Sequence, residues 1–397
     1  MAFERPQLDH LLQRFSGKPI NLQILAGPRQ VGKTTLAIQL KNRVELPTIY
    51  VTADEEVNPS GSWVEQQWQA ARVQQANNPN EPLLLIIDEI QKVQDWSERI
   101  KKLWDEDRRN EISIHVLLTG SSRMLLQKGL SESLAGRFEW IPIYQWTYSE
   151  MKEAFGYTPE EYVWFGGYPG AAVLKENELR WKNYVLDSLI ETTLSRDILM
   201  LSRIEKPALL RSLFEVGSDA STRIISFNKL LGQLQDAGNT VTLSYYLELL
   251  DTAGLLAGLE KIYEQKMRRR GSSPKFQVFD TCLQSVYSDF NLQEALEKPE
   301  VWGHFVESAV GAHLIKGSRY HRFEVYYWRE RSQEVDYVLK KGNRLIGIEV
   351  KSGTHKPSST KGMEQFQRKF QPRKIFMVGS EALPWQEFLL LDPITLF

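Results

Sequence analysis

The sequence contains little cysteine and no long apolar run. Cys282 is the only cysteine among 397 residues, which excludes an internal disulfide and a zinc site built from several cysteines. The longest purely apolar run extends from Leu83 to Ile87, far short of the roughly 20 residues that cross a bilayer. The first ten residues carry charges instead of an apolar signal segment. We therefore expect a protein of the reducing cytoplasm without a membrane partner.

Neither sign of charge is in excess over the whole chain. Lysine and arginine number 49 against 50 acidic residues, a formal net charge of -1, so total charge does not indicate a polyanion partner. The distribution is uneven, because residues 340–374 contain ten basic residues and two acidic ones. This segment fits a surface that contacts nucleic acid and fits equally a solvated basic face.

The first motif with a chemical role is a glycine-rich loop between an apolar strand and a helix. Four residues separate Gly27 from Gly32, Lys33 and Thr34. This is the spacing of a P-loop, whose backbone N–H groups and following helix N-terminus surround phosphates. Lys33 is expected to reach the β and γ phosphates of ATP, and Thr34 to ligate Mg2+. The predicted nucleotide-binding residues are Gly27, Pro28, Arg29, Gln30, Val31, Gly32, Lys33, Thr34 and Thr35.

A buried strand that ends in two acids supplies the expected partner of this loop. The run Leu83 to Ile87 leads into Asp88 and Glu89, and a continuous apolar strand is typical of the centre of a parallel sheet. Asp88 is predicted to hold the magnesium ion and Glu89 to polarise the attacking water. A later strand ends at Thr119, which is the candidate for contact with the γ phosphate. Ser121 is the second choice, although it can instead cap a helix.

The order of these motifs resembles a known family. The segments GPRQVGKT, LLLIIDEIQKV, LLTGSS and SLAGRFEW are similar to those of prokaryotic AAA+ ATPases that carry a DUF4143-type C-terminal region. The resemblance implies ATP and Mg2+ as cofactors. It makes Arg137 a candidate sensing residue, or one that acts on a neighbouring subunit in a self-associated protein; an ordinary surface arginine is the alternative. It also makes Pro169 and Tyr168 candidates for contact with adenine from a helical lid, although a tight turn would need the same neighbouring glycines.

Residues 207–279 predict short helices followed by a β pair. Ser226 is expected to cap a first helix and Thr242 a second, with strands over residues 254–263 and 275–279. This order is typical of a winged helix.

The charges of this region favour the wing over the helix as a DNA contact. The second helix contains no lysine or arginine, which argues against base reading. The turn between the strands contains Lys266, Arg268, Arg269, Arg270 and Lys275. These cations fit phosphate binding without sequence preference. A protein-docking winged helix with a solvated basic loop is the alternative.

A hairpin near the C-terminus brings two acids together. If Gly342 and Asn343 form the turn, residues whose numbers sum to 685 face each other, and Asp336 lies opposite Glu349 with Lys351 on the same face. Two carboxylates at this separation repel each other. A bound Mg2+ or Mn2+ would relieve the repulsion and is used in phosphodiester hydrolysis.

This arrangement resembles the active site of PD-(D/E)xK nucleases, and the DUF4143-type region resembles that fold. The resemblance makes Glu307, Asp336, Glu349 and Lys351 catalytic candidates, with Asp336 and Glu349 as metal ligands. Val335 stands where many such enzymes have proline. A structural ion cluster, or a degenerate site that only binds nucleic acid, is the alternative.

The chain is therefore expected to be an α/β protein: a P-loop AAA+ ATPase core with a helical lid, a winged helix and a C-terminal α/β restriction-endonuclease-like domain. We place these parts at residues 1–145, 146–206, 207–281 and 282–397. The leading hypothesis is an Mg-dependent ATPase that couples hydrolysis to DNA binding or processing. The alternative is a nucleotide-gated signalling switch with a protein-docking winged helix and an inert C-terminal fold.

Overall fold

The computed structural model describes residues 3–56, 59–121, 133–199, 204–234, 238–264, 272–351 and 361–397. The chain divides into two compact units, Met1–Tyr144 and Gln145–Phe397. Each unit has its own sheet and its own buried core. None of the helices in the described ranges is long and apolar enough to cross a membrane.

The first unit alternates strands and helices. Its elements are α1 (Gln7–Arg14), β1 (Leu22–Ala26), α2 (Lys33–Arg43), β2 (Thr48–Thr52), α3 (Gly61–Asn77), β3 (Leu83–Asp88), η1 (Ile90–Lys92), α4 (Trp96–Arg109), β4 (Ile114–Gly120) and β5 (Phe138–Pro142). The strands form one sheet in the order β2-β3-β4-β1-β5, in which every neighbouring pair is parallel. The expected P-loop α/β core is confirmed by this sheet.

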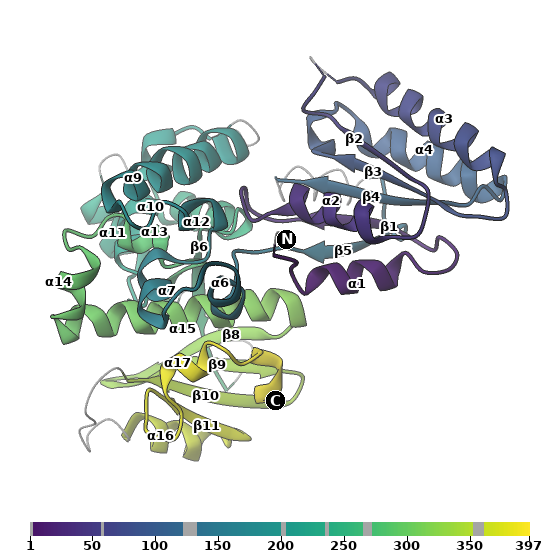
Figure 1. The fold of residues 1–397 in the computed structure, drawn as a ribbon. Helices are drawn as coiled ribbons and strands as arrows, with labels where there is room; N and C mark the ends of the chain where they lie inside the picture. The colour runs from purple at the N-terminus through teal and green to yellow at the C-terminus, as the bar shows by residue number, and fades with distance from the viewer. Residues whose placement is uncertain are drawn as a thin grey trace. The chain divides into compact units, whose positions relative to one another are not determined.

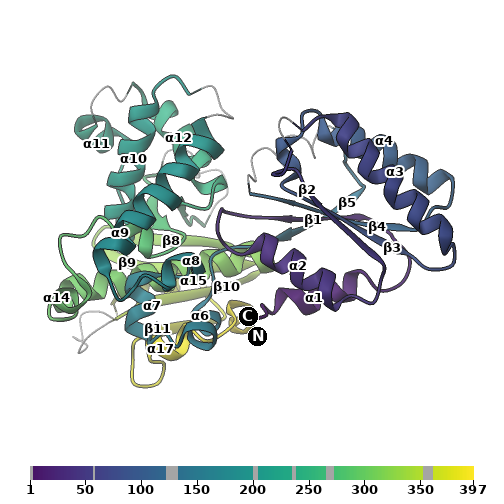
Figure 2. The same ribbon diagram turned by 45° about the horizontal axis from the view of Figure 1, so that its top comes forward.

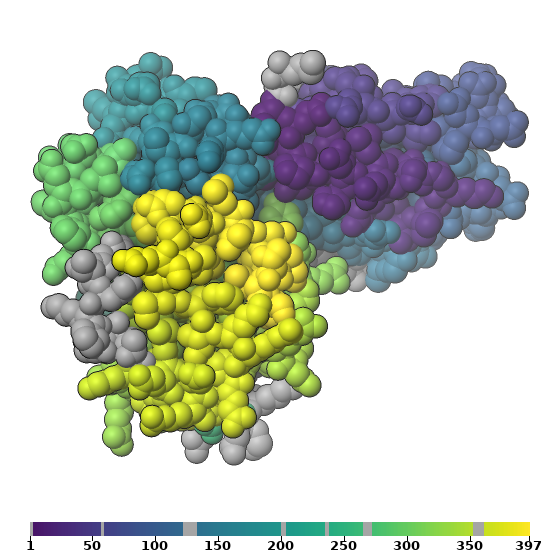
Figure 3. Space-filling model, turned by 60° about the horizontal axis from the view of Figure 1, so that its bottom comes forward, coloured from purple at the N-terminus to yellow at the C-terminus, as the bar shows by residue number. Residues whose placement is uncertain are grey.

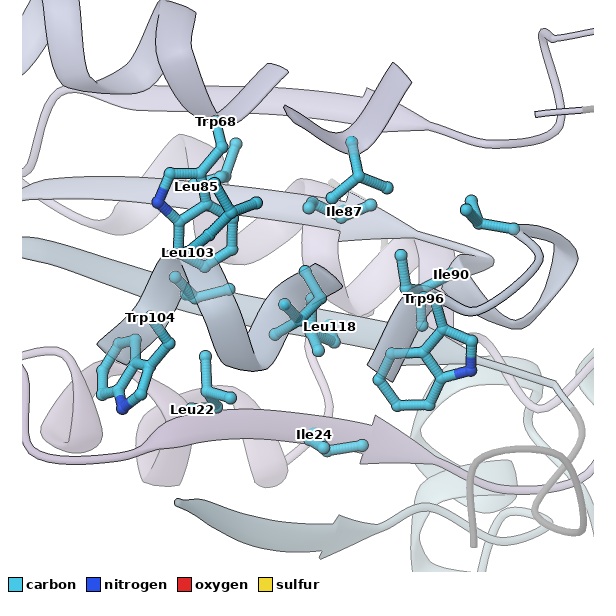
Figure 4. Packing of buried hydrophobic residues seen from close by; sticks show 14 of the residues in the cluster. Leu22, Ile24, Trp68, Leu85, Ile87, Ile90, Trp96, Leu103, Trp104 and Leu118 are labelled. Carbon is cyan, nitrogen blue, oxygen red and sulfur yellow. The ribbon is translucent and has the colours of Figure 1, made fainter. Parts of the chain in front are cut away.

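The sheet is covered on both faces, which explains the continuous apolar runs of its central strands. Helices α3 and α4 lie on one face and α1 and α2 on the other (Figures 1 and 2). All six residues of β3 are buried, as parallel strands between two helical layers require. Beneath α3 and α4, the tryptophans Trp68, Trp96 and Trp104 pack against leucines and isoleucines of β1, β3 and β4 (Figure 4).

The second unit begins with helices and ends with a mixed sheet. Its helical part comprises α6 (Tyr148–Phe155), α7 (Pro159–Phe165), α8 (Pro169–Ala172), α9 (Glu178–Asn183), the π-helical segments η2 (Tyr184–Glu191) and η3 (Thr193–Leu199), α10 (Pro207–Asp219), α11 (Phe227–Gln233) and α12 (Thr240–Thr252). Then follow β6 (Leu256–Lys261), β7 (Lys275–Val278), α13 (Cys282–Ser285), α14 (Leu292–Leu296), α15 (Pro299–His321), β8 (Glu324–Glu330), β9 (Gln333–Lys341), β10 (Arg344–Val350), α16 (Lys361–Phe370), β11 (Lys374–Val378), α17 (Trp385–Phe388) and η6 (Pro393–Leu396). Figure 3 shows the residues near the C-terminus (yellow) as a continuous surface on one face of this unit.

Local sequence explains where these helices begin. Thr147 and Thr158 each form a reciprocal capping box with a glutamate three residues later, which satisfies two orphan N–H groups at each start. Ser226 caps α11 as expected. The cap of α12 is Asn239, whose side chain accepts from the Thr242 N–H, so the expectation of Thr242 as the cap is wrong. Asparagine ranks above threonine as an N-cap residue, and the helix therefore begins one residue after Asn239.

One six-stranded sheet runs through the second unit in the order β11-β10-β9-β8-β6-β7. The β6–β7 pair is antiparallel, and β6 pairs parallel with β8 through Glu260 with Tyr326 and Lys261 with Tyr327. The expected boundary between residues 281 and 282 therefore divides strands that share one sheet.

The hairpin register deduced from the sequence is confirmed. Ile346 pairs with Leu339 and Ile348 pairs with Tyr337. Val338, on the same face of β9 as Asp336, is also fully buried and shares a core with Phe366 of α16. A helix covers this second face of the hairpin.

A substitution at Gly166 tests how much the close packing of the helical part against the rest of the second unit contributes to stability. Its φ is 72°, and a Cβ there would lie 1.8 Å from Asp280 Oδ1. We expect Gly166→Ala to lower the free energy of unfolding by about 1–3 kcal/mol more than a positive-φ glycine substitution alone, because overpacking adds to backbone strain. Gly156→Ala is the matched control, since Gly156 has a φ of 67° and nothing within 4 Å of an added Cβ. Equal losses for both variants in denaturant titrations would contradict the packing role.

Candidate nucleotide site and C-terminal acid cluster

The P-loop lies between β1 and α2 and is held by close backbone contacts. A Cβ on Gly27 would lie 1.7 Å from the Ile143 carbonyl oxygen, so only glycine allows the loop to pass there. Gly32 has a φ of 90° and directly precedes α2. The buried Arg5 guanidinium donates to the carbonyls of Val31 (3.1 Å) and Tyr144 (3.3 Å). The loop is thus fixed in shape before any phosphate arrives.

The side chain of Lys33 lies inside this loop. Its ammonium donates to the Pro28 carbonyl oxygen at 2.6 Å, and the residue is only 5% exposed. Gln30, at the tip, has a φ of 59°, a left-handed conformation that is uncommon outside glycine. A curled loop around a lysine ammonium is the geometry that a phosphate-binding loop requires.

Three hydroxyl groups converge on the buried carboxylate of Asp88. Thr34 Oγ1 and the Tyr50 hydroxyl each donate to Asp88 Oδ2 at 2.9 Å, and Thr119 Oγ1 donates to Oδ1. Asp88 is 2% exposed. The Thr34 hydroxyl and the Asp88 carboxylate are adjacent oxygen ligands of the kind that Mg2+ prefers, so the predicted pair is brought together.

Glu89 follows Asp88 in a left-handed conformation, with a φ of 53°. Its Oε2 accepts from Ser121 Oγ (3.0 Å) and from Gln91 Nε2, and Gln91 Nε2 also lies 3.1 Å from Ser121 Oγ. The Glu89 N–H donates to Thr119 Oγ1 at 3.3 Å. Thr119 therefore contacts both Asp88 and Glu89, and Ser121 holds the carboxylate of Glu89.

Tyr50, Gln91 and Arg5 contribute to the site but were missed in the sequence. Burial, and then the Asp88 charge, raise the pKa of Tyr50, so its hydroxyl remains a donor to Asp88. Tyr50 belongs to β2, the neighbour of β3. A tyrosine in the strand that pairs with the acidic strand was the available signal.

Arg137 is not brought to the nucleotide site of its own subunit. Its backbone carbonyl accepts from the Leu22 N–H at the amino end of β1, whereas the P-loop follows the carboxyl end of the same strand. Its guanidinium forms two hydrogen bonds with Asp105, at 2.7 and 3.0 Å. This pairing lowers the pKa of Asp105. A role in cis is thereby disfavoured, and a role on a neighbouring subunit would require release from Asp105.

The Phe165–Gly170 turn has a structural reason for its glycines. A Cβ on Gly167 would lie 2.1 Å from the Trp146 carbonyl oxygen. Tyr168 is buried and accepts a hydrogen bond from Gln145 Nε2 at 2.8 Å, so it is a core residue of the second unit. Pro169 is half-buried at the start of α8. Its contact with adenine stays a prediction.

The four C-terminal candidates lie in one cluster with residues that the sequence did not single out. Asp336 Oδ2 accepts from the Val350 N–H at 2.8 Å, next to Glu349. Lys351 Nζ donates to Glu349 Oε1 at 2.6 Å. Burial, and then the Asp336 charge, raise the pKa of Glu349 to about 8. Its Oε2 is buried without a hydrogen-bond partner.

Lys275 is the unexpected member of the cluster. Its side chain is completely buried, and its ammonium lies 2.8 Å from Glu307 Oε1 and 3.6 Å from both Glu334 Oε1 and Asp336 Oδ1. Burial alone would lower the pKa of Lys275, but the three carboxylates outweigh burial and raise it. Burial raises the pKa of Glu307 to about 7, against the opposing effect of Lys275.

The prediction that Lys275 belongs to the basic turn of the wing is therefore wrong. It belongs to β7 and faces acids, so it does not belong to a phosphate-binding surface. Lys266, Arg268, Arg269 and Arg270 lie outside the described residues. Elements α11, α12, β6 and β7 follow one another in the order that a winged helix requires. Helix α12 contains no lysine or arginine for base contacts. Its acids are Asp251 and the exposed Glu248, and Asp251 accepts from Arg319 at 2.6 Å.

Comparison with known protein families assigns most of the chain. Residues 20–152 match the AAA domain family AAA_14, and residues 302–396 match DUF4143, a domain of unknown function. The chain joins an AAA domain to a DUF4143 domain. Residues 157–294, between these two domains, match DUF8612, another domain of unknown function. The AAA domain contains the P-loop, β3 and β4, and the DUF4143 domain contains Glu307, Asp336, Glu349 and Lys351.

Relatives cover nearly the whole chain, and those compared carry no assigned activity. An uncharacterized protein of Haemophilus influenzae is 22% identical over 83% of this chain and 82% of its own length. An uncharacterized protein of Mycobacterium tuberculosis is 26% identical over 93% of this chain and 79% of its own length. The alignments with these proteins therefore extend into both the AAA and the DUF4143 regions of this chain.

Solved structures show weaker similarity. The Thermotoga maritima RuvB Holliday junction branch migration motor is 19% identical, with 64% of this chain and 89% of that chain covered and a TM-score of 0.32. The Aeropyrum pernix ORC1 protein, solved in complex with DNA, is 15% identical, with 71% and 91% covered and a TM-score of 0.30. TM-scores at this level do not indicate a shared function.

The Tyr50 hydroxyl tests whether the hydrogen bonds around Asp88 matter for turnover. We expect Tyr50→Phe to lower the kcat for Mg-ATP hydrolysis by about tenfold, because loss of an orienting hydrogen bond to a metal-ligating carboxylate typically costs 10- to 100-fold. Tyr245→Phe, in the exposed part of α12, is the control. Steady-state phosphate release measures both variants, and an unchanged kcat in Tyr50→Phe would assign the orientation of Asp88 to Thr34 and Thr119 alone.

Proposed function

We propose that the AAA domain binds and hydrolyses ATP with Mg2+. The observation that carries this conclusion is the contact of Thr34 with Asp88 at 2.9 Å, directly beside the curled loop that surrounds Lys33. Two elements 54 residues apart in sequence thus present one hydroxyl and one carboxylate at a phosphate-binding loop.

Each side chain has a definite task in this reaction. Lys33 and the loop N–H groups neutralise the β and γ phosphates, and Thr34 and Asp88 would hold the magnesium ion, which offsets phosphate charge when bound. Glu89 polarises the attacking water. Ser121 and Gln91 engage only Oε2 of Glu89, so the other carboxylate oxygen can accept a proton. Thr119, which contacts Asp88 and the Glu89 N–H, would respond to the γ phosphate.

We further propose that the ATP cycle controls engagement of DNA by the second unit. The support is the basic composition of residues 340–374 and of the segment between β6 and β7. Arg137 would act between subunits of a self-associated protein, because it lies at the amino edge of the sheet of its own subunit.

The burial of Lys275 among three acids favours a second candidate function. In this version the AAA domain is a nucleotide-gated switch and the DUF4143 domain performs no cleavage. A panel of linear, flapped and branched DNA with Mg2+ or Mn2+, with and without ATP, separates the two. Cleavage in an Asp336-dependent manner supports processing, and ATP-dependent binding without cleavage supports controlled engagement of DNA. Neither binding nor cleavage of any DNA form supports the nucleotide-gated switch.

Two substitutions separate ATP binding from ATP turnover. Lys33→Ala is expected to abolish nucleotide binding, because the phosphates lose their buried counter-charge. Glu89→Gln should bind ATP normally and lose at least about 100-fold in kcat, since general-base assistance is typically worth 10²–10⁴. Glu98→Gln, at the start of α4, is the control. Fluorescent-nucleotide titration and phosphate release provide the readouts, and wild-type turnover by Glu89→Gln would move the water-positioning role to another residue.

The basic segment between β6 and β7 yields a prediction about salt. Replacing Arg268, Arg269 and Arg270 by alanine should weaken DNA binding equally for all sequences. The slope of log K against log salt should flatten by up to about three, because each lost phosphate contact removes about 0.9 released counterions. The control replaces Lys340, Lys341 and Arg344 by alanine, which separates this segment from the C-terminal basic region. Unchanged affinity at low salt after the first replacement would favour a protein partner.

A further inference from the structure

The acid cluster of the second unit already contains a cation from the protein itself. Lys275 of β7 is fully buried and reaches Glu307 of α15 together with Glu334 and Asp336 of β9. Its ammonium also donates to the Asp336 carbonyl oxygen at 3.2 Å and lies 4.8 Å from the centre of the Tyr337 ring. Carboxylates, a carbonyl and an aromatic face are all groups that stabilise a buried ammonium.

The carboxylate oxygens that a metal would need are largely engaged. Asp336 Oδ2 accepts the Val350 N–H and Glu349 Oε1 accepts from Lys351. A divalent ion requires several oxygens at about 2.0–2.6 Å, and one held by Asp336 would lie close to the Lys275 ammonium. Only Glu349 Oε2 in this cluster is buried without a partner. Within the described ranges, no group of three histidine, cysteine, aspartate or glutamate side chains is placed to hold a metal ion.

We propose that Lys275 is the permanent cation of this cluster and takes the place of the divalent ion that the acids would otherwise bind. The DUF4143 domain of this chain is then a non-nucleolytic module, and the cluster fastens the β7 strand to α15 and β9. Removal of the lysine charge leaves Glu307, Glu334 and Asp336 without their shared counter-charge. The same acids then become a site for Mg2+ or Mn2+.

The test uses the full chain with Asp88→Asn, in the absence of nucleotide, so that the P-loop cannot hold the ion. Melting temperature is measured with and without millimolar Mn2+ in the parent, in Lys275→Met and in Lys275→Arg. We expect no Mn2+ effect in the parent or in Lys275→Arg, which keeps the cation. Lys275→Met should melt several degrees lower, because an uncompensated buried charge remains. Mn2+ should then restore part of the loss by linkage.

A third substitution identifies the ligands. Adding Asp336→Asn to Lys275→Met should remove the Mn2+ effect. Lys340→Met is the control for the loss of a lysine from the same sheet, since Lys340 lies 3.8 Å from Glu324 at its surface. Stabilisation of Lys275→Met by Mn2+ that persists without Asp336 would contradict the assignment.

If Lys275→Met does not fold, Mn2+ binding to the parent protein tests the proposal by itself. Loss of the free Mn2+ paramagnetic resonance signal reports binding directly. We expect no bound Mn2+ at 1 mM free ion, on the order of the weakest protein sites for hard divalent ions, and no cleavage of any DNA form. Mn2+ binding that disappears with Asp336→Asn would overturn the proposal. Because nucleotide is absent throughout, this outcome is independent of whether the AAA domain hydrolyses ATP.

Discussion

Parallel pairing of β1, β3 and β4 is the constraint on which the nucleotide site depends. Because all three strands end at the same edge of the sheet, the P-loop, Asp88 and Thr119 meet there although they are separated by tens of residues. Asp88 then fixes the details, because its two oxygens accept from Thr34, Tyr50 and Thr119. The buried runs of the strands are equally necessary, since a carboxylate is held in place only if the strand that carries it cannot slip. Packing of Trp68 and Trp96 beneath α3 and α4 supplies that rigidity.

Features that depend on short stretches of sequence could be predicted. The P-loop spacing, the apolar strand that ends at Asp88 and the cap at Ser226 each depend on neighbouring residues. The hairpin register was also accessible, because the turn at Gly342 and the alternation of apolar residues leave one solution. The Thr34–Asp88 contact followed from recognition of the P-loop and of the strand that ends at Asp88. The proximity of Asp336 to Glu349 followed from the hairpin register.

Features that depend on a distant partner could not be predicted. Lys275 looked like part of a run of cations, and its role depends on Glu307, which lies 32 residues away on α15. The pairing of Arg137 with Asp105 similarly depends on where α4 packs. The sequence identifies an arginine or a lysine but does not show whether an acidic side chain pairs with it in the folded protein. The sign of the local charge decides between a phosphate contact and an internal ion pair.

The shared sheet has a consequence for how the second unit can transmit a signal. Strand β6 pairs with β7 on one side and with β8 on the other, and the Ile262 N–H continues this pairing to the Tyr327 carbonyl at 2.8 Å. Strand β7 follows β6 in the chain, so a displacement of either strand acts on the sheet that both share with β8–β11. The buried Lys275 adds ion pairs from β7 to acids of α15 and β9. The β6–β7 pair cannot move independently of the sheet, because this motion would break hydrogen bonds between strands and expose the buried Lys275 ammonium. Each of these losses costs kilocalories per mole. A displacement of β7 would therefore be transmitted to the sheet as a whole.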